Sequence, residues 1–238
     1  MSFNLYKKII DEICDKVYDV NLFHRGEPLL NKNVLSMIAY AGSKQIKTRV
    51  HTNATLLNRE LSKKIILAGL DLISFSFDGY TKKIYEKNRS GAKFEQTLAN
   101  IIDFLKIKKQ LNSKKPYTII QVIQDGKKLS PNEISRQKTV FLQNFQNLPL
   151  NKLISRVPHN WGGLLKIKGS GGRRVKDRKV VPCTFPWYSL TIFYDGKVFL
   201  CPQDFEGKIC IGDLNKDSIE EIFNGEKIKE IKRNSRKA

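Results

Sequence analysis

Hydrophobic positions along this 238-residue chain follow two rhythms, one helical and one of short extended runs. Residues 2–17 place apolar side chains at spacings of three and four, which predicts an amphipathic helix. Short apolar or β-branched runs follow, with segments of helical periodicity between them. The runs lie at residues 20–24, 48–51, 72–77, 117–123 and a weaker 152–156. This alternation predicts parallel strands joined by helices.

The connecting segments carry helix signals of their own. Asn58 is a good N-cap for a helix that stops at Gly69, and Phe94 opens the apolar stripe of a long helix. The remaining helices are expected at residues 33–41, 81–86 and 130–147. The pattern opens with a helix where a parallel α/β domain normally opens with a strand, so we expect the chain to begin inside a domain.

The composition changes from Pro158 onward. Glycine-rich loop sequences come first, and then two extended runs joined by Asp195-Gly196, which predicts a β-hairpin. Two short helices are expected at 217–223 and 226–233. We therefore divide the chain into a domain of residues 1–157 and a small α+β hairpin-and-helix extension of residues 158–238.

The chain is basic, with 43 Lys and Arg against 23 Asp and Glu and a formal charge of +20. A basic surface can attract nucleic acid. Scattered lysines on solvated helix faces are the alternative, and we favour it because only residues 166–179 and 227–237 concentrate the charge. No apolar run approaches the roughly 18 residues of a membrane span, and no signal pattern is present, so we expect a cytoplasmic protein without a membrane partner.

Cysteine usage points to metal more than to disulfides. Of the four cysteines, Cys183, Cys201 and Cys210 lie in the last 56 residues of a chain with no export signal. Cys210 precedes a predicted turn, and we expect it to pack in the core. Cys14 adjoins the apolar stripe of the first helix and is expected to be a buried structural thiol.

Polar residues follow three of the predicted strands, at the edge where parallel sheets bind ligands. Each has an ordinary alternative when taken alone, as a helix-entry charge, a turn residue or a solvated loop residue. Together, an acid for an ammonium group and donors for a carboxylate suit a free amino-acid moiety. The candidates are Gly26, Glu27 and Pro28, then Asn53, then Ser76 and Asp78, and finally Arg89.

The same segments resemble radical S-adenosylmethionine (radical SAM) enzymes. The sequence from Phe23 to Leu30 resembles the family's Gly-Glu segment, which holds the amino group of the cofactor's methionine moiety. His51 to Leu57 and Ile73 to Gly79 resemble the next two strand ends of the family. The resemblance implies that Glu27 binds the cofactor amino group, and that Asn53, Ser76 and Arg89 bind its carboxylate or ribose side.

The last third resembles a SPASM or Twitch extension, which carries auxiliary iron–sulfur clusters on cysteine thiolates. The resemblance runs from Cys183 through Asp195-Gly196 and Cys201 to the Ile211-Gly212-Asp213 turn. It implies that Cys183 and Cys201 belong to an incomplete auxiliary cluster site. A pair of buried thiols is the alternative.

Two departures from the family pattern stand in the sequence. The Cys-x3-Cys-x2-Cys loop that holds the radical SAM [4Fe–4S] cluster is absent, and so is the later Cys-x2-Cys of SPASM proteins. We expect either a fragment with a mis-assigned start and stop or a degenerate paralogue, inactive alone in both cases. The implied fold is a partial (β/α) barrel of parallel strands whose first strand is missing.

The implied activity of the intact protein is reductive cleavage of S-adenosylmethionine to a 5′-deoxyadenosyl radical, which abstracts hydrogen from a peptide or another substrate. An electron donor such as flavodoxin or ferredoxin would serve that reaction. A catalytically silent S-adenosylmethionine-binding module is one alternative. A basic nucleic-acid-binding protein is a second, ranked lower because the lysines form no defined stripe.

Overall fold

The computed structural model describes residues 1–123, 129–156 and 183–237. Its contacts divide the chain into two compact units, one of residues 16–158 and one that joins residues 1–15 to residues 159–238. The first helix thus groups with the C-terminal segment, whereas the sequence-based division had put it with residues 1–157. That division into domains stays a prediction. The linker, the glycine-rich loops and the basic stretch 166–179 lie outside the described residues.

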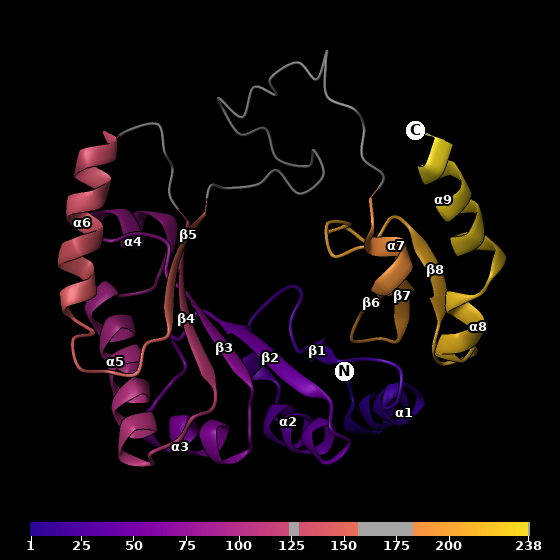
Figure 1. Ribbon diagram of the computed structural model, residues 1–238, viewed down its shortest axis with the longest axis horizontal. Helices are drawn as coiled ribbons and strands as arrows, with labels where there is room; N and C mark the ends of the chain where they lie inside the picture. Colours follow the sequence, from indigo (N-terminus) through magenta and orange to yellow (C-terminus); the bar gives the residue numbers. More distant parts are fainter. Residues whose placement is uncertain (124–128, 157–182, 238) are drawn as a thin grey trace. The chain divides into compact units, whose positions relative to one another are not determined.

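The unit of residues 16–158 alternates strands and helices (Figure 1). Its strands are β1 (Asp19–Asn21), β2 (Lys47–Thr52), β3 (Leu72–Ser76), β4 (Tyr117–Ile123) and β5 (Lys152–Arg156). Its helices are the 3-10 turn η1 (Pro28–Leu30), α2 (Val34–Ser43), α3 (Arg59–Leu67), α4 (Lys82–Asn88), α5 (Phe94–Gln110) and α6 (Pro131–Gln143). The last two strands have the bounds that the sequence predicts.

The five strands form one sheet in chain order, and every neighbouring pair is parallel. The expected α/β class is confirmed. Because all strands run the same way, their carboxyl ends meet at one edge. The polar segments that follow β1, β2 and β3 therefore lie at the same edge of the sheet.

The helices of this unit pack against one face of the sheet (Figure 1). Side chains on that face, such as Val50, Ile73, Phe75 and Ile120, are buried and join the helices in the main hydrophobic core. Alternate residues point to the opposite face. No helix among the described residues 16–158 covers that second face, which we call the open face.

The second unit is built on a small antiparallel sheet. Its elements are α1 (Phe3–Ile13), α7 (Phe185–Tyr188), β6 (Thr191–Ile192), β7 (Lys197–Phe199), β8 (Cys210–Asp213), α8 (Ile219–Phe223) and α9 (Glu226–Lys237). Strands β6 and β7 form the expected hairpin, with Gly196 in the left-handed conformation (φ 91°) at its turn. Ser218 and Glu221 form a capping box at the start of α8.

Helix α1 is tied to this unit by two polar contacts. Lys8 Nζ donates to the Leu214 carbonyl at 2.7 Å, and the Ile219 amide donates to Glu12 Oε2 at 2.8 Å. The second contact satisfies one of the free amides at the start of α8. These two contacts join α1 to residues that lie 206 and 207 positions later in the chain.

Two expectations about cysteines are wrong. Cys14 is exposed because α1 ends at Ile13, which leaves the thiol beyond the buried stripe. Cys210 is also exposed. Strand β8 alternates, so buried Ile211 faces the core and Cys210 points away from it.

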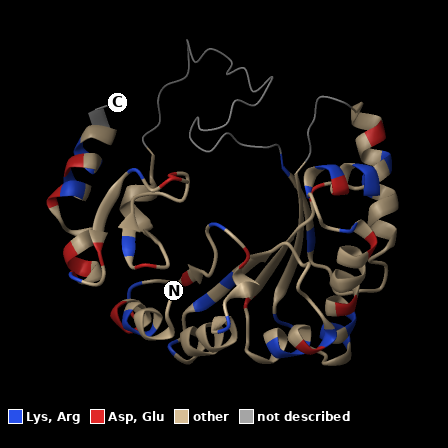
Figure 2. Ribbon diagram, turned by 180° about the vertical axis from the view of Figure 1, so that it is seen from behind, with Lys and Arg blue, Asp and Glu red and all other residues tan. Residues whose placement is uncertain are grey.

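The charged residues are spread over both units (Figure 2). Basic and acidic side chains alternate along the helices, and several form exposed ion pairs such as Lys64–Glu60 and Lys82–Glu95. This pattern fits solvated helix faces. No helix among the described residues is long and apolar enough to cross a lipid bilayer.

Gly79, which follows β3, offers a test of this packing. Its φ is +156°, and a Cβ added there would lie 2.6 Å from Ile84 Cγ2 and 2.7 Å from the Tyr85 amide nitrogen. Overpacking and backbone strain together predict that Gly79→Ala lowers the free energy of unfolding by about 2 kcal/mol. Urea unfolding measures the change.

Gly42→Ala in α2 is the matched control, because nothing lies within 4 Å of a Cβ built there. A helical glycine replaced by alanine should gain up to about 1 kcal/mol. Equal unfolding midpoints for the two variants would contradict the packing at Gly79.

Candidate functional site

Glu27 is positioned by the sharp turn that follows β1. Gly26 adopts the left-handed conformation (φ 82°), which an L side chain rarely adopts. Pro28 opens η1, and Glu27 is the N-cap of that turn, with Oε1 accepting from the Leu29 amide at 3.1 Å. The local sequence therefore presents the carboxylate at the carboxyl edge of the sheet.

The end of β2 holds the same carboxylate from the other side. Thr52 Oγ1 donates to Glu27 Oε1 at 2.7 Å, and the backbone N–H of Asn53 donates to Glu27 Oε2 at 2.7 Å. Thr52 is buried, and its hydroxyl also accepts from the Ala54 amide. A carboxylate has about four acceptor positions. Three are used here, which leaves one free on Oε2.

Asn53 presents a donor at this edge. Its Oδ1 accepts from the Thr55 amide at 2.9 Å and from Thr55 Oγ1 at 2.6 Å. Its Nδ2 has no hydrogen-bond partner among the described residues. Thr55 thus occupies the oxygen of the Asn53 side-chain amide, and the two N–H donors on Nδ2 are left for a ligand.

Ser76 lies at the same level on the next strand. The register pairs Thr52 with Phe75, so Asn53 and Ser76 follow at neighbouring positions, and Ser76 itself pairs with Gln121 of β4. Ser76 is half-buried, and its hydroxyl makes no hydrogen bond within the described part of the chain. It is free to donate to, or accept from, a bound molecule.

Asp78 and Arg89 pair with each other. Arg89 Nε lies 2.9 Å from Asp78 Oδ2, and their side chains are 24% and 16% exposed. The N–H does not align as a hydrogen bond, and Asp78 Oδ1 is buried with no partner among the described residues. Burial raises the pKa of Asp78, while Arg89 opposes the rise. The guanidinium keeps its terminal nitrogens for other groups.

His51 lies on the open face, next to Phe23. Their rings stack with centroids 4.0 Å apart and an interplanar angle of 18°. Burial, together with the positive charges of Arg156 and Arg49, lowers the pKa of His51 to about 4. The imidazole is therefore neutral at pH 7.

The cysteines of the second unit are separate features in the structure. Cys183 is exposed just before α7, and Cys201 is half-buried after β7 with its Sγ accepting from the Gln203 amide at 3.3 Å. All four thiols are free. Within the described ranges, no three His, Cys, Asp or Glu side chains group as a metal site. The described residues thus fit the amino-acid part of a cofactor but not a complete iron–sulfur cluster.

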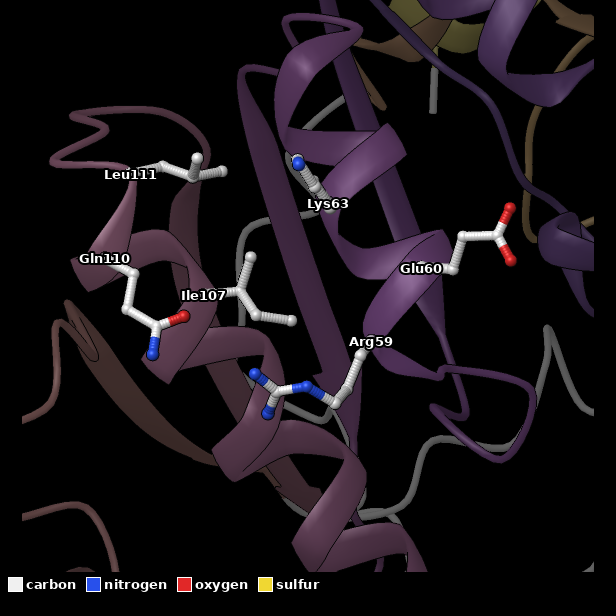
Figure 3. A pocket seen from close by; sticks show the side chains of 6 residues that line it. All are labelled: Arg59, Glu60, Lys63, Ile107, Gln110 and Leu111. Atoms are coloured by element: carbon white, nitrogen blue, oxygen red, sulfur yellow. The ribbon is translucent and has the colours of Figure 1, made fainter.

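A hollow of about 360 Å³ lies elsewhere, between α3 and α5 (Figure 3). It is lined by Arg59, Glu60, Lys63, Ile107, Gln110 and Leu111. Arg59 reaches between the helices, where it pairs with Asp103 at 3.5 Å, and Glu60 points away from the hollow (Figure 3). The hollow has no residue in common with the strand ends and no convergent chemistry.

The structure therefore brings together most of the residues that the sequence singled out. Glu27 and Asn53 are in direct contact, Ser76 follows at the same edge, and Asp78 binds Arg89. We call these five residues the strand-end cluster. Their roles toward a ligand stay predictions. Sequence reasoning missed Thr52, although a threonine directly before Asn53 at a strand end was a usable signal.

Comparison with known proteins adds two family matches. The Radical SAM superfamily matches residues 1–113, and the SPASM iron–sulfur cluster-binding domain matches residues 183–238. A curated relative, the Fe-coproporphyrin III synthase of Methanosarcina barkeri, is 37% identical over 73 residues. That match covers 31% of this chain and 18% of the relative. Matches cover 18% to 34% of the length of the curated relatives.

Solved structures share the fold. Native anSMEcpe with bound AdoMet superposes with a TM-score of 0.64 at 15% identity, covering 97% of this chain and 74% of that one. Streptococcus suis SuiB bound to precursor peptide SuiA gives 0.65 at 12% identity, covering 94% and 58%. These matches confirm the partial-barrel architecture.

The open face predicts an unusual histidine titration. In the folded chain the His51 ring should stay neutral until the pH falls to about 4, against an ordinary value of 6.5. Since the unfolded chain takes up that proton first, the His51 contribution to stability is lost as pH falls from about 6.5 to about 4. Proton–carbon NMR of the imidazole C–H groups measures the pKa, and His51→Gln identifies the signal by removing it. A His51 midpoint near 6.5 would contradict the burial described here.

Proposed function

This chain belongs to the radical SAM superfamily and carries a SPASM domain, and on that premise we propose that its strand-end cluster binds S-adenosylmethionine (AdoMet). The proposal concerns residues 16–158, which hold every member of the cluster. What supports it is the arrangement of one acid and several donors along a single sheet edge. An α-amino acid moiety carries both kinds of partner, an ammonium group and a carboxylate.

Glu27 carries the proposal. Its carboxylate is held by the Thr52 hydroxyl and the Asn53 amide, and one acceptor position stays free on Oε2. An ammonium group placed there would make a charge-assisted hydrogen bond to an acid that does not need to reorganise. Gly26 and Pro28 contribute by shaping the turn that delivers Glu27.

The opposite side of the ligand would meet donors. Asn53 Nδ2, the Ser76 hydroxyl and the terminal nitrogens of Arg89 suit the AdoMet carboxylate or ribose oxygens. Asp78 would hold Arg89 at 2.9 Å and so limit the rotamers of the guanidinium. In this role Asp78 positions Arg89, whereas the sequence suggested a direct contact with the cofactor.

In this superfamily a [4Fe–4S] cluster supplies the electron that cleaves AdoMet to a 5′-deoxyadenosyl radical, and the described residues do not group the ligands for one. We propose Cys183 and Cys201 as ligands of an auxiliary cluster in the SPASM domain. The contribution of this chain is to bind AdoMet and orient its methionine moiety.

The substrate and partners belong to the whole protein. We propose a peptide or a small molecule as the substrate, because solved structures of this fold include SuiB bound to a precursor peptide, and a curated relative is an Fe-coproporphyrin III synthase. A flavodoxin or ferredoxin would supply electrons to the intact enzyme.

Calorimetry with AdoMet tests the role of Glu27. Glu27→Gln removes the negative charge and places an N–H donor near the Asn53 amide or the Thr52 hydroxyl. We expect AdoMet to bind at least about tenfold more weakly, a loss of about 1.4 kcal/mol. Glu60→Gln is the control, because Glu60 is exposed on α3 and pairs with Lys64. Equal affinity of the two variants would remove Glu27 from the site.

Thr52→Val separates the position of the carboxylate from its charge. The variant keeps the Glu27 carboxylate and deletes one of its three donors, so we expect a smaller loss of AdoMet affinity, about fivefold. Thr52→Ser should restore binding. If the unmodified chain gives no heat with AdoMet, the proposed function itself fails.

A further inference from the structure

The open face of the sheet carries a second group of polar side chains. Arg49 and His51 of β2 and Ser74 of β3 alternate with core residues along their strands, and the register places Arg156 of β5 on the same face. The register pairs His51 directly with Ser74. These four side chains lie on one face, next to the strand-end cluster but distinct from it, and we call them the open-face group.

Positive charge on this face is only partly compensated. Asp19 of β1 pairs with Arg49. Arg156 is exposed and forms no ion pair with any described residue. Both guanidinium groups are close enough to His51 to disfavour its protonated form. Lys47 of β2 and Lys152 of β5 also lie on the open face. Asp19 is the single acid that the five strands place on this face.

Ser74 supplies an independent sign of a missing partner. It is 1% exposed, and its hydroxyl has no hydrogen-bond partner among the described residues. A buried hydroxyl normally has one, since leaving it unpaired costs roughly 1–3 kcal/mol. The chain continues past Ser74 through buried Phe75, which faces the helices, so the orphaned hydroxyl lies on the open face.

We propose that the open-face group binds a carboxylate of the reactant that shares this sheet with AdoMet, with Arg156 as its charge partner and Ser74 as a hydrogen-bond donor. The inference rests on the proposed function and deepens it by naming the substrate class as anionic. A guanidinium fork matches a carboxylate in two parallel hydrogen bonds. Because His51 is neutral, it adds no further positive charge to this face.

The experiment uses the full chain and succinate as the probe. Succinate is titrated at pH 7 while the His51 ring signals are followed by NMR. We expect saturable shifts of His51, because Arg156 is close enough to His51 to act on its charge and Ser74 is its partner on the next strand. Succinamide, the neutral analogue of the same shape, should leave the signals unchanged.

Arg156→Gln should weaken succinate binding at least fivefold. The matched control is Arg136→Gln, since Arg136 is exposed on α6 and pairs with Glu133. Ser74→Ala, which deletes only the orphaned hydroxyl, should weaken binding by a smaller factor. AdoMet affinity is measured for each variant by calorimetry and should stay within about twofold of the parent.

Three outcomes would overturn the inference. One is a His51 signal that does not respond to succinate, and another is an equal response to succinamide. The third is loss of AdoMet affinity in Arg156→Gln, which would assign the guanidinium to the cofactor. In each case the Glu27 calorimetry reports separately on the proposed function, so the two failures can be told apart.

Discussion

The candidate site depends on one bridge between neighbouring strand ends, in which the Glu27 carboxylate accepts from the Asn53 amide and the Thr52 hydroxyl. Strand β1 has only three residues and lies at the edge of the sheet, and the bridge ties the turn after it to the end of β2. The bridge makes the carboxylate part of the sheet edge. A preorganised acid of this kind binds an ammonium group without first being ordered, which is why it can contribute to affinity.

The one-sided covering of the sheet decides where other chemistry can lie. The core beneath the helices buries Val50, Ile73 and Phe75, so only the residues that alternate with them can contact a ligand on the sheet. On that open face His51 stacks on Phe23, and the positive charges of Arg49 and Arg156 help to keep it neutral. The sheet therefore presents two kinds of surface, an edge that offers an acid with donors and a face that offers cations.

The C-terminal unit depends on a helix from the other end of the chain. Its small sheet would bury little by itself, and α1, from the other end of the chain, adds buried Ile9, Ile10 and Ile13 to the unit. Lys8 of that helix donates to the Leu214 carbonyl, and Glu12 accepts from the first amide of α8. The thiols of Cys183 and Cys210 are exposed in this unit, and that of Cys201 is half-buried.

The sequence by itself determined the β-α order, the strands Tyr117–Ile123 and Lys152–Arg156, the Asp-Gly hairpin and the identity of the strand-end residues. Those features depend on local spacing and turn chemistry, which neighbouring residues specify. Only the tertiary structure decided that Asp78 binds Arg89, that Thr52 holds Glu27, and that α1 joins a segment about 200 residues away. Burial was also decided there, as Cys14 and Cys210 show: whether a thiol is covered depends on where its helix ends and which way its strand faces, and both follow from contacts between elements distant in the chain.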